Sequence, residues 1–84
     1  MANTIDTLAA KLAEDTMAAM DKTGQDRLYV EVGEVLAASS QSLEEAFLTE
    51  IRVRLAERTA RKFLIKKLAA SQKQAADTAK IPQA

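Results

Sequence analysis

The sequence predicts a small all-α protein made of two short helices and one long C-terminal helix. Glycine and proline, the residues that most often interrupt helices, occur only twice and once among 84 residues. Apolar residues recur at intervals of three and four along most of the chain, which is the spacing of one helix face. We therefore expect a single helical domain over residues 1–70 and a frayed or disordered tail over residues 71–84.

The first helix is expected to begin at Asn3 or Thr4, either of which can cap it, and to end near Lys22. Its apolar stripe has the helical spacing and consists of Ile5, Leu8, Ala9, Leu12, Thr16, Ala19 and Met20. Met17 and Met20, close to the end of this helix, are expected to fill the core.

A turn and a second helix should follow. Gly24 is suited to the left-handed conformation after a helix, and Asp26 is a candidate cap for the next one. From residue 27 two patterns coexist, an alternation typical of a strand (Leu28, Val30, Val32) and a helical stripe (Leu28, Val32, Val35, Leu36, Ser39). We favour a helix over residues 27–38. The alternative is a strand that pairs with a second copy, because isolated strand pairs are marginal.

The third helix is expected after the polar run of residues 39–42. Ser42 and Glu45 have the S-x-x-E spacing of a capping box, which predicts a helix that begins at Leu43. It should continue to about Ser71 or beyond. A helix of that length needs packing partners along its whole extent.

The apolar face of this long helix changes sides near Thr59. At about 100° per residue, one sector holds Phe47, Leu48, Ile51 and Leu55 and then continues with Arg58, Lys62 and Lys66. The later apolar residues, which lie around the opposite side, are Ala60, Phe63, Leu64 and Leu68. Either the helix bends or breaks there, or its two halves contact different partners. A second copy is the simplest partner, so we expect a dimer or higher homo-oligomer.

The charges are segregated along the chain although the net charge is zero. Residues 1–50 hold ten acidic and three basic residues, a net charge of −7. Residues 51–84 hold nine basic and two acidic residues, a net charge of +7. Such asymmetry indicates a binding partner, or pairing of one half of the chain with the other.

The basic run of the long helix is the strongest local feature, and it comprises Arg52, Arg54, Arg58, Arg61, Lys62, Lys66 and Lys67. The favoured interpretation is structural: the run pairs with the acidic half, in the same chain or a neighbour, or is a solvated helix face. A nucleic-acid interface is the alternative. Residues 32–46 loosely resemble a helix-turn-helix. However, Glu44 and Glu45 occupy the positions that would approach the DNA, where phosphates repel them.

These patterns predict a candidate interaction surface rather than a catalytic site. Its residues are Arg54, Arg58, Arg61, Lys62, Phe63, Leu64, Lys66 and Leu68. The function we expect is that of a small non-enzymatic interaction or regulatory module acting as a homo-oligomer, with a protein partner possible. The alternative function is nucleic-acid binding through the basic run from Arg52 to Lys67.

Composition argues against enzymatic chemistry. The chain has no cysteine and no histidine, which removes disulfides, thiolate ligands, the commonest metal ligand and the usual general base. The acidic pair Glu31 and Glu34 fits a solvated helix face, and the serines of residues 39–42 lack a histidine base. The two glycines are isolated and form no phosphate-binding loop. We expect no cofactor, no metal and no enzymatic activity.

The expected location is the cytoplasm. No stretch approaches the roughly 18 apolar residues of a membrane span, and the N-terminus lacks the basic and apolar regions of a secretory signal. The alanine-rich composition would suit a bacterial protein.

Overall fold

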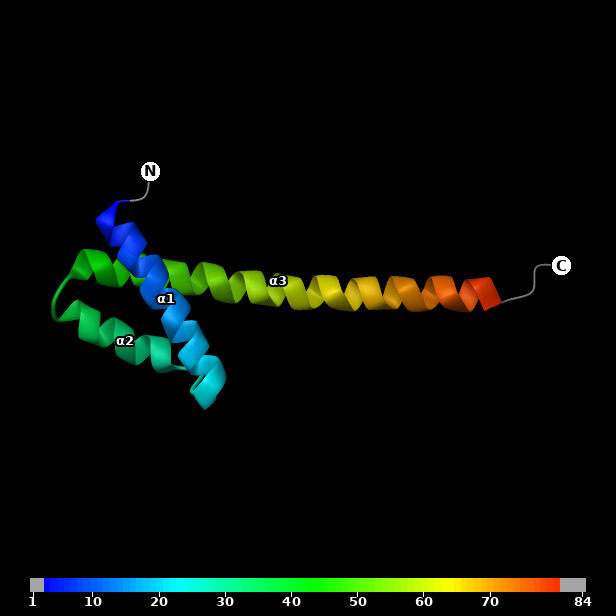
Figure 1. Cartoon of the computed structure of the whole chain (residues 1–84), viewed down its shortest axis with the longest axis horizontal. Coiled ribbons are helices and arrows are strands. Elements are labelled where there is room, and N and C mark those ends of the chain that lie inside the picture. Colours follow the sequence, from blue (N-terminus) through cyan, green and yellow to red (C-terminus); the bar gives the residue numbers. More distant parts are fainter. Residues whose placement is uncertain (1–2, 81–84) are drawn as a thin grey trace. The chain divides into compact units, whose positions relative to one another are not determined.

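A computed structural model shows three helices, α1 (Thr4–Thr23), α2 (Leu28–Ala37) and α3 (Gln41–Lys80), and no strand among residues 3–80 (Figure 1). It describes the backbone of residues 3–80 and the side chains of residues 3–74. The prediction of an all-α protein with two short helices and one long one is confirmed. The chain divides into two units, Met1–Arg54 and Leu55–Ala84, which are described separately below.

The ends of α1 follow the sequence. Asn3 caps the helix, because its Oδ1 accepts a hydrogen bond of 2.8 Å from the backbone N–H of Asp6. Gly24 ends it with a φ of 72°, and its N–H donates to the carbonyl of Met20 at 2.8 Å. A glycine is favoured there because a Cβ is strained in the left-handed region.

The segment from residue 28 is a helix, as we favoured, and not a strand. The predicted cap is wrong, however. Arg27 occupies the capping position and makes no side-chain hydrogen bond to the helix, so Asp26 does not cap α2. Backbone bonds close the turn instead, from the N–H of Leu28 to the carbonyl of Gln25 and from Val30 to Arg27.

The start of α3 also differs from the prediction. The helix begins at Gln41 rather than Leu43, and Ser40 rather than Ser42 caps it. The hydroxyl of Ser40 accepts a hydrogen bond of 3.2 Å from the N–H of Leu43. The reason lies in the preceding turn, where the N–H groups of Ser39 and Ser40 both donate to the carbonyl of Leu36. This tight turn leaves Ser40 at the capping position.

The long helix is continuous through Thr59, where a bend or break was one of the expected outcomes. The hydroxyl of Thr59 donates back to the carbonyl of Leu55 at 3.1 Å, within the helical ladder. The helix runs beyond Ser71 to Lys80, so residues 71–80 of the predicted tail are helical here. Residues 81–84 lie outside the described part of the chain.

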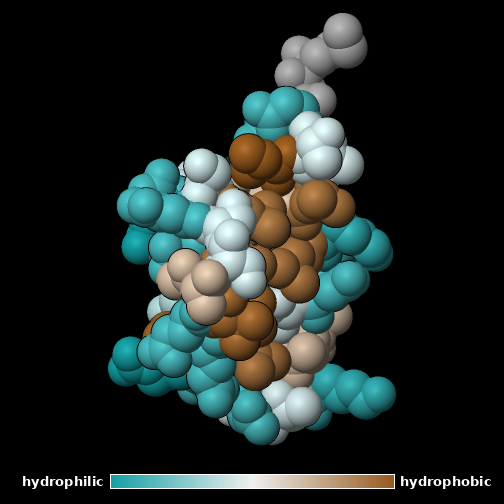
Figure 2. Space-filling view, turned by 90° about the vertical axis from the view of Figure 1, so that its left-hand side faces the viewer, coloured by the Kyte–Doolittle hydropathy of each residue, from teal (hydrophilic) through white to brown (hydrophobic). Residues whose placement is uncertain are grey.

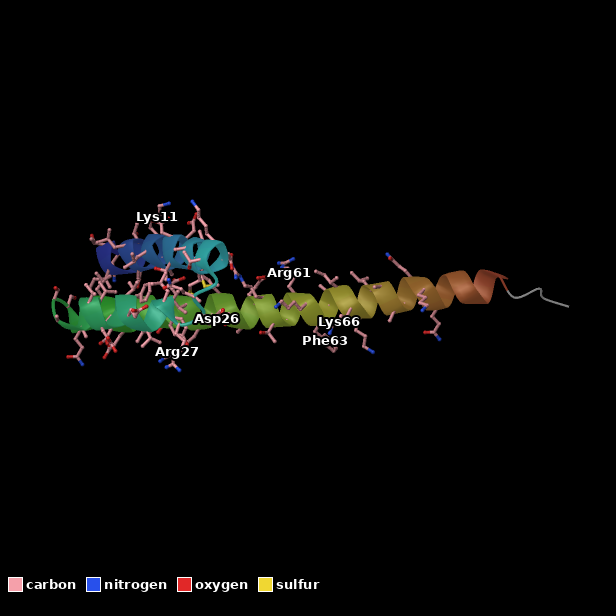
Figure 3. The ribbon with its side chains drawn as sticks, turned by 90° about the horizontal axis from the view of Figure 1, so that it is seen from below. Lys11, Asp26, Arg27, Arg61, Phe63 and Lys66 are labelled. Atoms are coloured by element: carbon pink, nitrogen blue, oxygen red, sulfur yellow. The ribbon has the colours of Figure 1, made fainter. Side chains whose placement is uncertain are left out.

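The first unit has two layers. α2 and the beginning of α3 form a helical hairpin, and α1 crosses it in a layer of its own (Figures 1 and 3). Gly33 of α2 faces Leu48 of α3, and an added Cβ would lie 3.4 Å from Cδ2 of Leu48. A side-chain hydrogen bond from Arg54 to the backbone of Ala10 joins α3 to α1.

The core of the first unit is small. Its buried apolar residues are Ala9, Ala13, Met17, Met20, Phe47 and Ile51, and Thr16 is buried with them. Phe47 and Ile51 are the largest fully buried side chains. The predicted core roles of Met17 and Met20 are therefore confirmed.

Some positions of the predicted apolar stripes are exposed instead. Ile5 and Leu8 are 39% and 54% exposed, because α1 turns its alanines and methionines toward the hairpin. Val35 is 70% exposed, because α2 meets α3 through Gly33, which lies about 200° away from Val35 around the helix.

Candidate interaction surface

The second unit contains a helical segment in which almost every described side chain is exposed. We call residues 55–80 of α3 the distal helix. Every described side chain from Ala56 to Gln74 is exposed, and Leu55 is half-buried. Helices in water gain most of their stability by packing an apolar face against another element. The distal helix therefore presents a surface suited to a partner.

Apolar side chains lie along one side of the distal helix. We call Ala60, Phe63, Leu64 and Leu68 the apolar stripe. At about 100° per residue they occupy one sector of about 140°. Phe63, Leu64 and Leu68 are 65%, 54% and 52% exposed. Side chains of this size in an adjacent group are typical of interaction surfaces, whereas scattered single residues are not.

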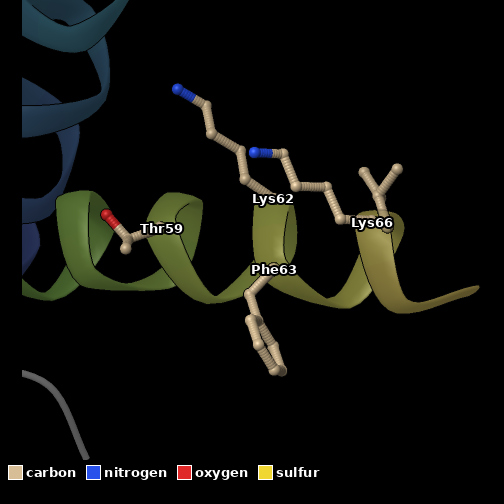
Figure 4. Close-up of a pocket in the computed structure, with 5 residues that line it drawn as sticks. Thr59, Lys62, Phe63 and Lys66 are labelled. Carbon is tan, nitrogen blue, oxygen red and sulfur yellow. The ribbon is translucent and has the colours of Figure 1, made fainter. Parts of the chain in front are cut away.

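Most basic side chains of the distal helix lie outside the sector of the apolar stripe, and Lys67 lies within it. Lys62 and Lys66 project together, and the ring of Phe63 points the opposite way (Figure 4). Arg61 and Phe63 likewise leave the helix on opposite sides (Figure 3). Together with Thr59 and Ile65, the two lysines and Phe63 line a hollow on the helix surface. The hollow is open and formed by flexible side chains, so it does not resemble an enclosed ligand site.

Arg54 does not belong to this exposed surface, although the sequence grouped it there. It lies in the first unit and is about one-third exposed. Its Nη2 donates to the carbonyl of Ala10 at 3.3 Å, and its Nε is 3.6 Å from Oε2 of Glu50. That Nε is buried and has no hydrogen-bond acceptor. The geometry gives Arg54 a structural role in joining α3 to α1.

The remaining predicted residues lie together on the distal helix: Arg58, Arg61, Lys62, Phe63, Leu64, Lys66 and Leu68. Arg61 donates from its Nε to Oε1 of Glu57, one turn earlier on the same helix. Such exposed pairs contribute less than about 1 kcal/mol, so Arg61 is easily recruited by a partner. Lys62 and Lys66, four residues apart, carry like charges that destabilise an isolated helix by a few tenths of a kcal/mol.

The two units carry net charges of opposite sign. The first unit holds ten acidic and five basic residues, a net charge of −5, and the second holds two acidic and seven basic residues, a net charge of +5. The two units are therefore electrostatically complementary, whether they meet within one copy or between copies.

The first unit has an apolar surface that the sequence did not identify. Figure 2 shows a band of apolar side chains on the side of the first unit that faces left in Figure 1. The exposed residues Ile5 and Leu8, together with the half-buried Leu12, lie on one side of α1. We call these three residues the N-terminal band. Their helical spacing led to the expectation that they are buried in the core. Nothing in the sequence showed that alanines of α1 would face the hairpin instead of these larger side chains.

One ion pair perturbs a pKa on α1. Nζ of Lys11 lies 3.2 Å from Oδ1 of Asp15, on the exposed side of the helix. The hydrogen bond and the charge of Asp15 raise the pKa of Lys11 above its ordinary value, and the charge of Glu14 acts in the same direction. The pair is fully solvated and has the properties of a surface ion pair.

The described residues show neither a metal site nor a membrane span. Among them, no three acidic side chains come together as a ligand set for a metal ion. None of the helices in this part of the chain has an apolar stretch long enough to cross a bilayer.

No family model matches the chain, and no match was found among curated proteins or among solved structures.

Proposed function

We propose that this chain is a small non-enzymatic interaction or regulatory module that acts as a homo-oligomer through helix–helix contacts. The observation that carries the proposal is the apolar stripe, whose three large side chains are all more than half exposed. Complete burial of a side chain of this size contributes about 1.5–3 kcal/mol. Because these three side chains are little more than half exposed, burying the exposed part contributes about half of that each. Another copy of the chain is present in every solution of the protein, and it can pack on the exposed stripe.

The non-enzymatic part of the proposal rests on the side chains available. The chain has no histidine or cysteine. Among the serines of residues 39–42, Ser40 uses its hydroxyl to cap α3. The lysines that line the open hollow, Lys62 and Lys66, are exposed, whereas a catalytic lysine is normally desolvated to lower its pKa.

Light scattering coupled to size-exclusion chromatography tests the proposal on the full chain. We expect a dimer or higher oligomer at micromolar concentration. The double variant Phe63→Ala/Leu68→Ala should shift it to monomer, because two apolar anchors are lost while alanine preserves the helix. Ile65→Ala is the matched control, since Ile65 is equally exposed but lies on the basic side. A wild-type chain that stays monomeric at these concentrations would falsify the proposal.

Nucleic-acid binding is the second candidate, and the exposure of Lys62, Lys66 and Lys67 favours it. The support is weaker than the sequence implied, because Arg54 is engaged with Ala10 and Glu50. Binding to duplex DNA in a gel-shift assay should weaken steeply with salt if this candidate holds. The absence of a complex at low ionic strength would rule it out.

A further inference from the structure

The apolar stripe needs a docking surface, and we propose that this surface is the N-terminal band of a second copy. In this arrangement the distal helix of each copy packs on α1 of the other, so that both apolar surfaces are covered in one symmetric dimer. The inference rests on the proposed function, since it specifies how the homo-oligomer is built. It commits to one occupant, another copy of this chain.

Exposure of both surfaces is the first argument. Phe63, Leu64 and Leu68 are more than half exposed on the distal helix, and Leu8 is 54% exposed on α1. Every copy carries both surfaces. A two-fold arrangement therefore covers two stripes and two bands at once, and it leaves no unpaired surface to continue into a filament.

Charge complementarity is the second argument. The second unit carries a net charge of +5 and the first unit −5. Within α1, four acidic residues outnumber two basic ones. Docking the distal helix on α1 of a neighbour brings opposite charges to the rim of the contact, which favours association and sets its register.

The charges also argue against the simplest rival, in which two distal helices pair stripe to stripe. Each distal helix is strongly basic, so such a pair would bring two units of +5 together. Lys67 lies within the sector of the stripe, about 40° from Phe63 around the helix. Pairing stripe to stripe would therefore place ammonium groups inside the contact, where like charges are costly.

Single cysteines test the arrangement directly, because the chain has none of its own. A Leu8→Cys copy is mixed with an affinity-tagged Leu64→Cys copy, and a short bismaleimide cross-linker is added. We expect a covalent heterodimer that forms about ten times faster than in either control mixture, because docking raises the effective thiol concentration. The controls are Thr7→Cys with Leu64→Cys, and Leu8→Cys with Ile65→Cys, since Thr7 and Ile65 are exposed but lie off the two surfaces.

Alanine variants give a second readout that needs no cross-linking. Leu8→Ala and Leu64→Ala should each raise the dissociation constant of the oligomer about tenfold, whereas Thr7→Ala and Ile65→Ala should change it less than about twofold. A loss of affinity that is as large for Thr7→Ala as for Leu8→Ala would contradict docking on the N-terminal band.

Other outcomes separate this inference from the proposed function. Rapid cross-linking of Leu64→Cys to itself, in a chain that is still oligomeric, would show stripe-to-stripe pairing and overturn only the inference. An oligomer with no cross-link above the controls would do the same. A monomer whose Leu8→Cys/Leu64→Cys double variant cross-links internally, or which binds anionic vesicles or DNA instead, would overturn both proposals.

Discussion

Arg54 and Ala10 are joined by a hydrogen bond between a side chain of α3 and the backbone of α1. The guanidinium Nη2 donates to the Ala10 carbonyl at 3.3 Å, across 44 residues of sequence. Ala10 lies in the interior of α1, where a carbonyl ordinarily accepts a hydrogen bond from a backbone N–H of the same helix. The arginine is therefore a second donor to a carbonyl oxygen that has two lone pairs. Arg54 is also the last residue of the first unit. The contact therefore fastens the crossing helix to α3 at the end of the first unit, and the side chains of α3 from Ala56 to Gln74 are exposed.

Replacing Arg54 with alanine should destabilise the first unit by about 1–2 kcal/mol. A hydrogen bond from a charged group contributes about 1.5–3 kcal/mol, and the one-third exposure of this side chain reduces that value. Urea unfolding followed by far-UV circular dichroism measures the effect at one fixed protein concentration. Arg52→Ala is the control, because Arg52 lies two residues earlier on α3 and is exposed. Equal midpoints for the two variants would show that the contact with Ala10 contributes nothing.

The two phenylalanines should respond in opposite ways to substitution by alanine. Phe47 is fully buried, so Phe47→Ala should cost about 3–5 kcal/mol and leave so small a core largely unfolded. Phe63 is 65% exposed, so Phe63→Ala should change unfolding of a dilute sample by less than about 0.5 kcal/mol while weakening self-association. Circular dichroism and light scattering on the same samples separate the effects. Similar losses of folded structure in both variants would contradict the assigned burial.

The sequence predicted the helices and the change of face well, because both depend on local spacing. Ile51 and Phe63 lie about 120° apart around a single helix, and that angle follows from twelve residues of ordinary helical rotation. No tertiary information is needed to find it. The burial of Phe47 and Ile51 and the exposure of Phe63 then follow from which half of α3 has neighbours.

The failures of prediction concern contacts between helices. Leu8 and Ala13 both lie toward the apolar side of α1, and the crossing of the helices decides that Ala13 is buried while Leu8 is exposed. Arg54 looked like one more member of a basic run, because the sequence does not show that the Ala10 carbonyl lies within its reach. Ser40 and Ser42 are both plausible caps, and the tightness of the preceding turn selects Ser40.

The two glycines offer a second matched pair of substitutions. Gly33→Ala should stabilise the first unit by about 0.5–1 kcal/mol, because alanine is the better helix former and the new Cβ would meet Leu48 at 3.4 Å, an ordinary contact. Gly24→Ala should destabilise by about 1 kcal/mol, because Gly24 has a φ of 72°. Urea midpoints of the two variants should lie on opposite sides of the wild-type value. A Gly33→Ala variant with a lower midpoint would mean that Leu48 has no room to adjust.

The start of α3 can be tested by removing one hydroxyl at a time. Ser40→Ala should cost about 1 kcal/mol, because it deletes the acceptor for the N–H of Leu43. Ser42→Ala should be neutral or slightly stabilising, because Ser42 is an exposed residue inside the first turn, where alanine is the better helix former. Ser40→Gly is an informative control, since glycine is tolerated at a cap and should recover most of the loss. The reverse ranking, with Ser42→Ala the more damaging, would restore the capping box of Ser42 and Glu45 and move the start of the helix to Leu43.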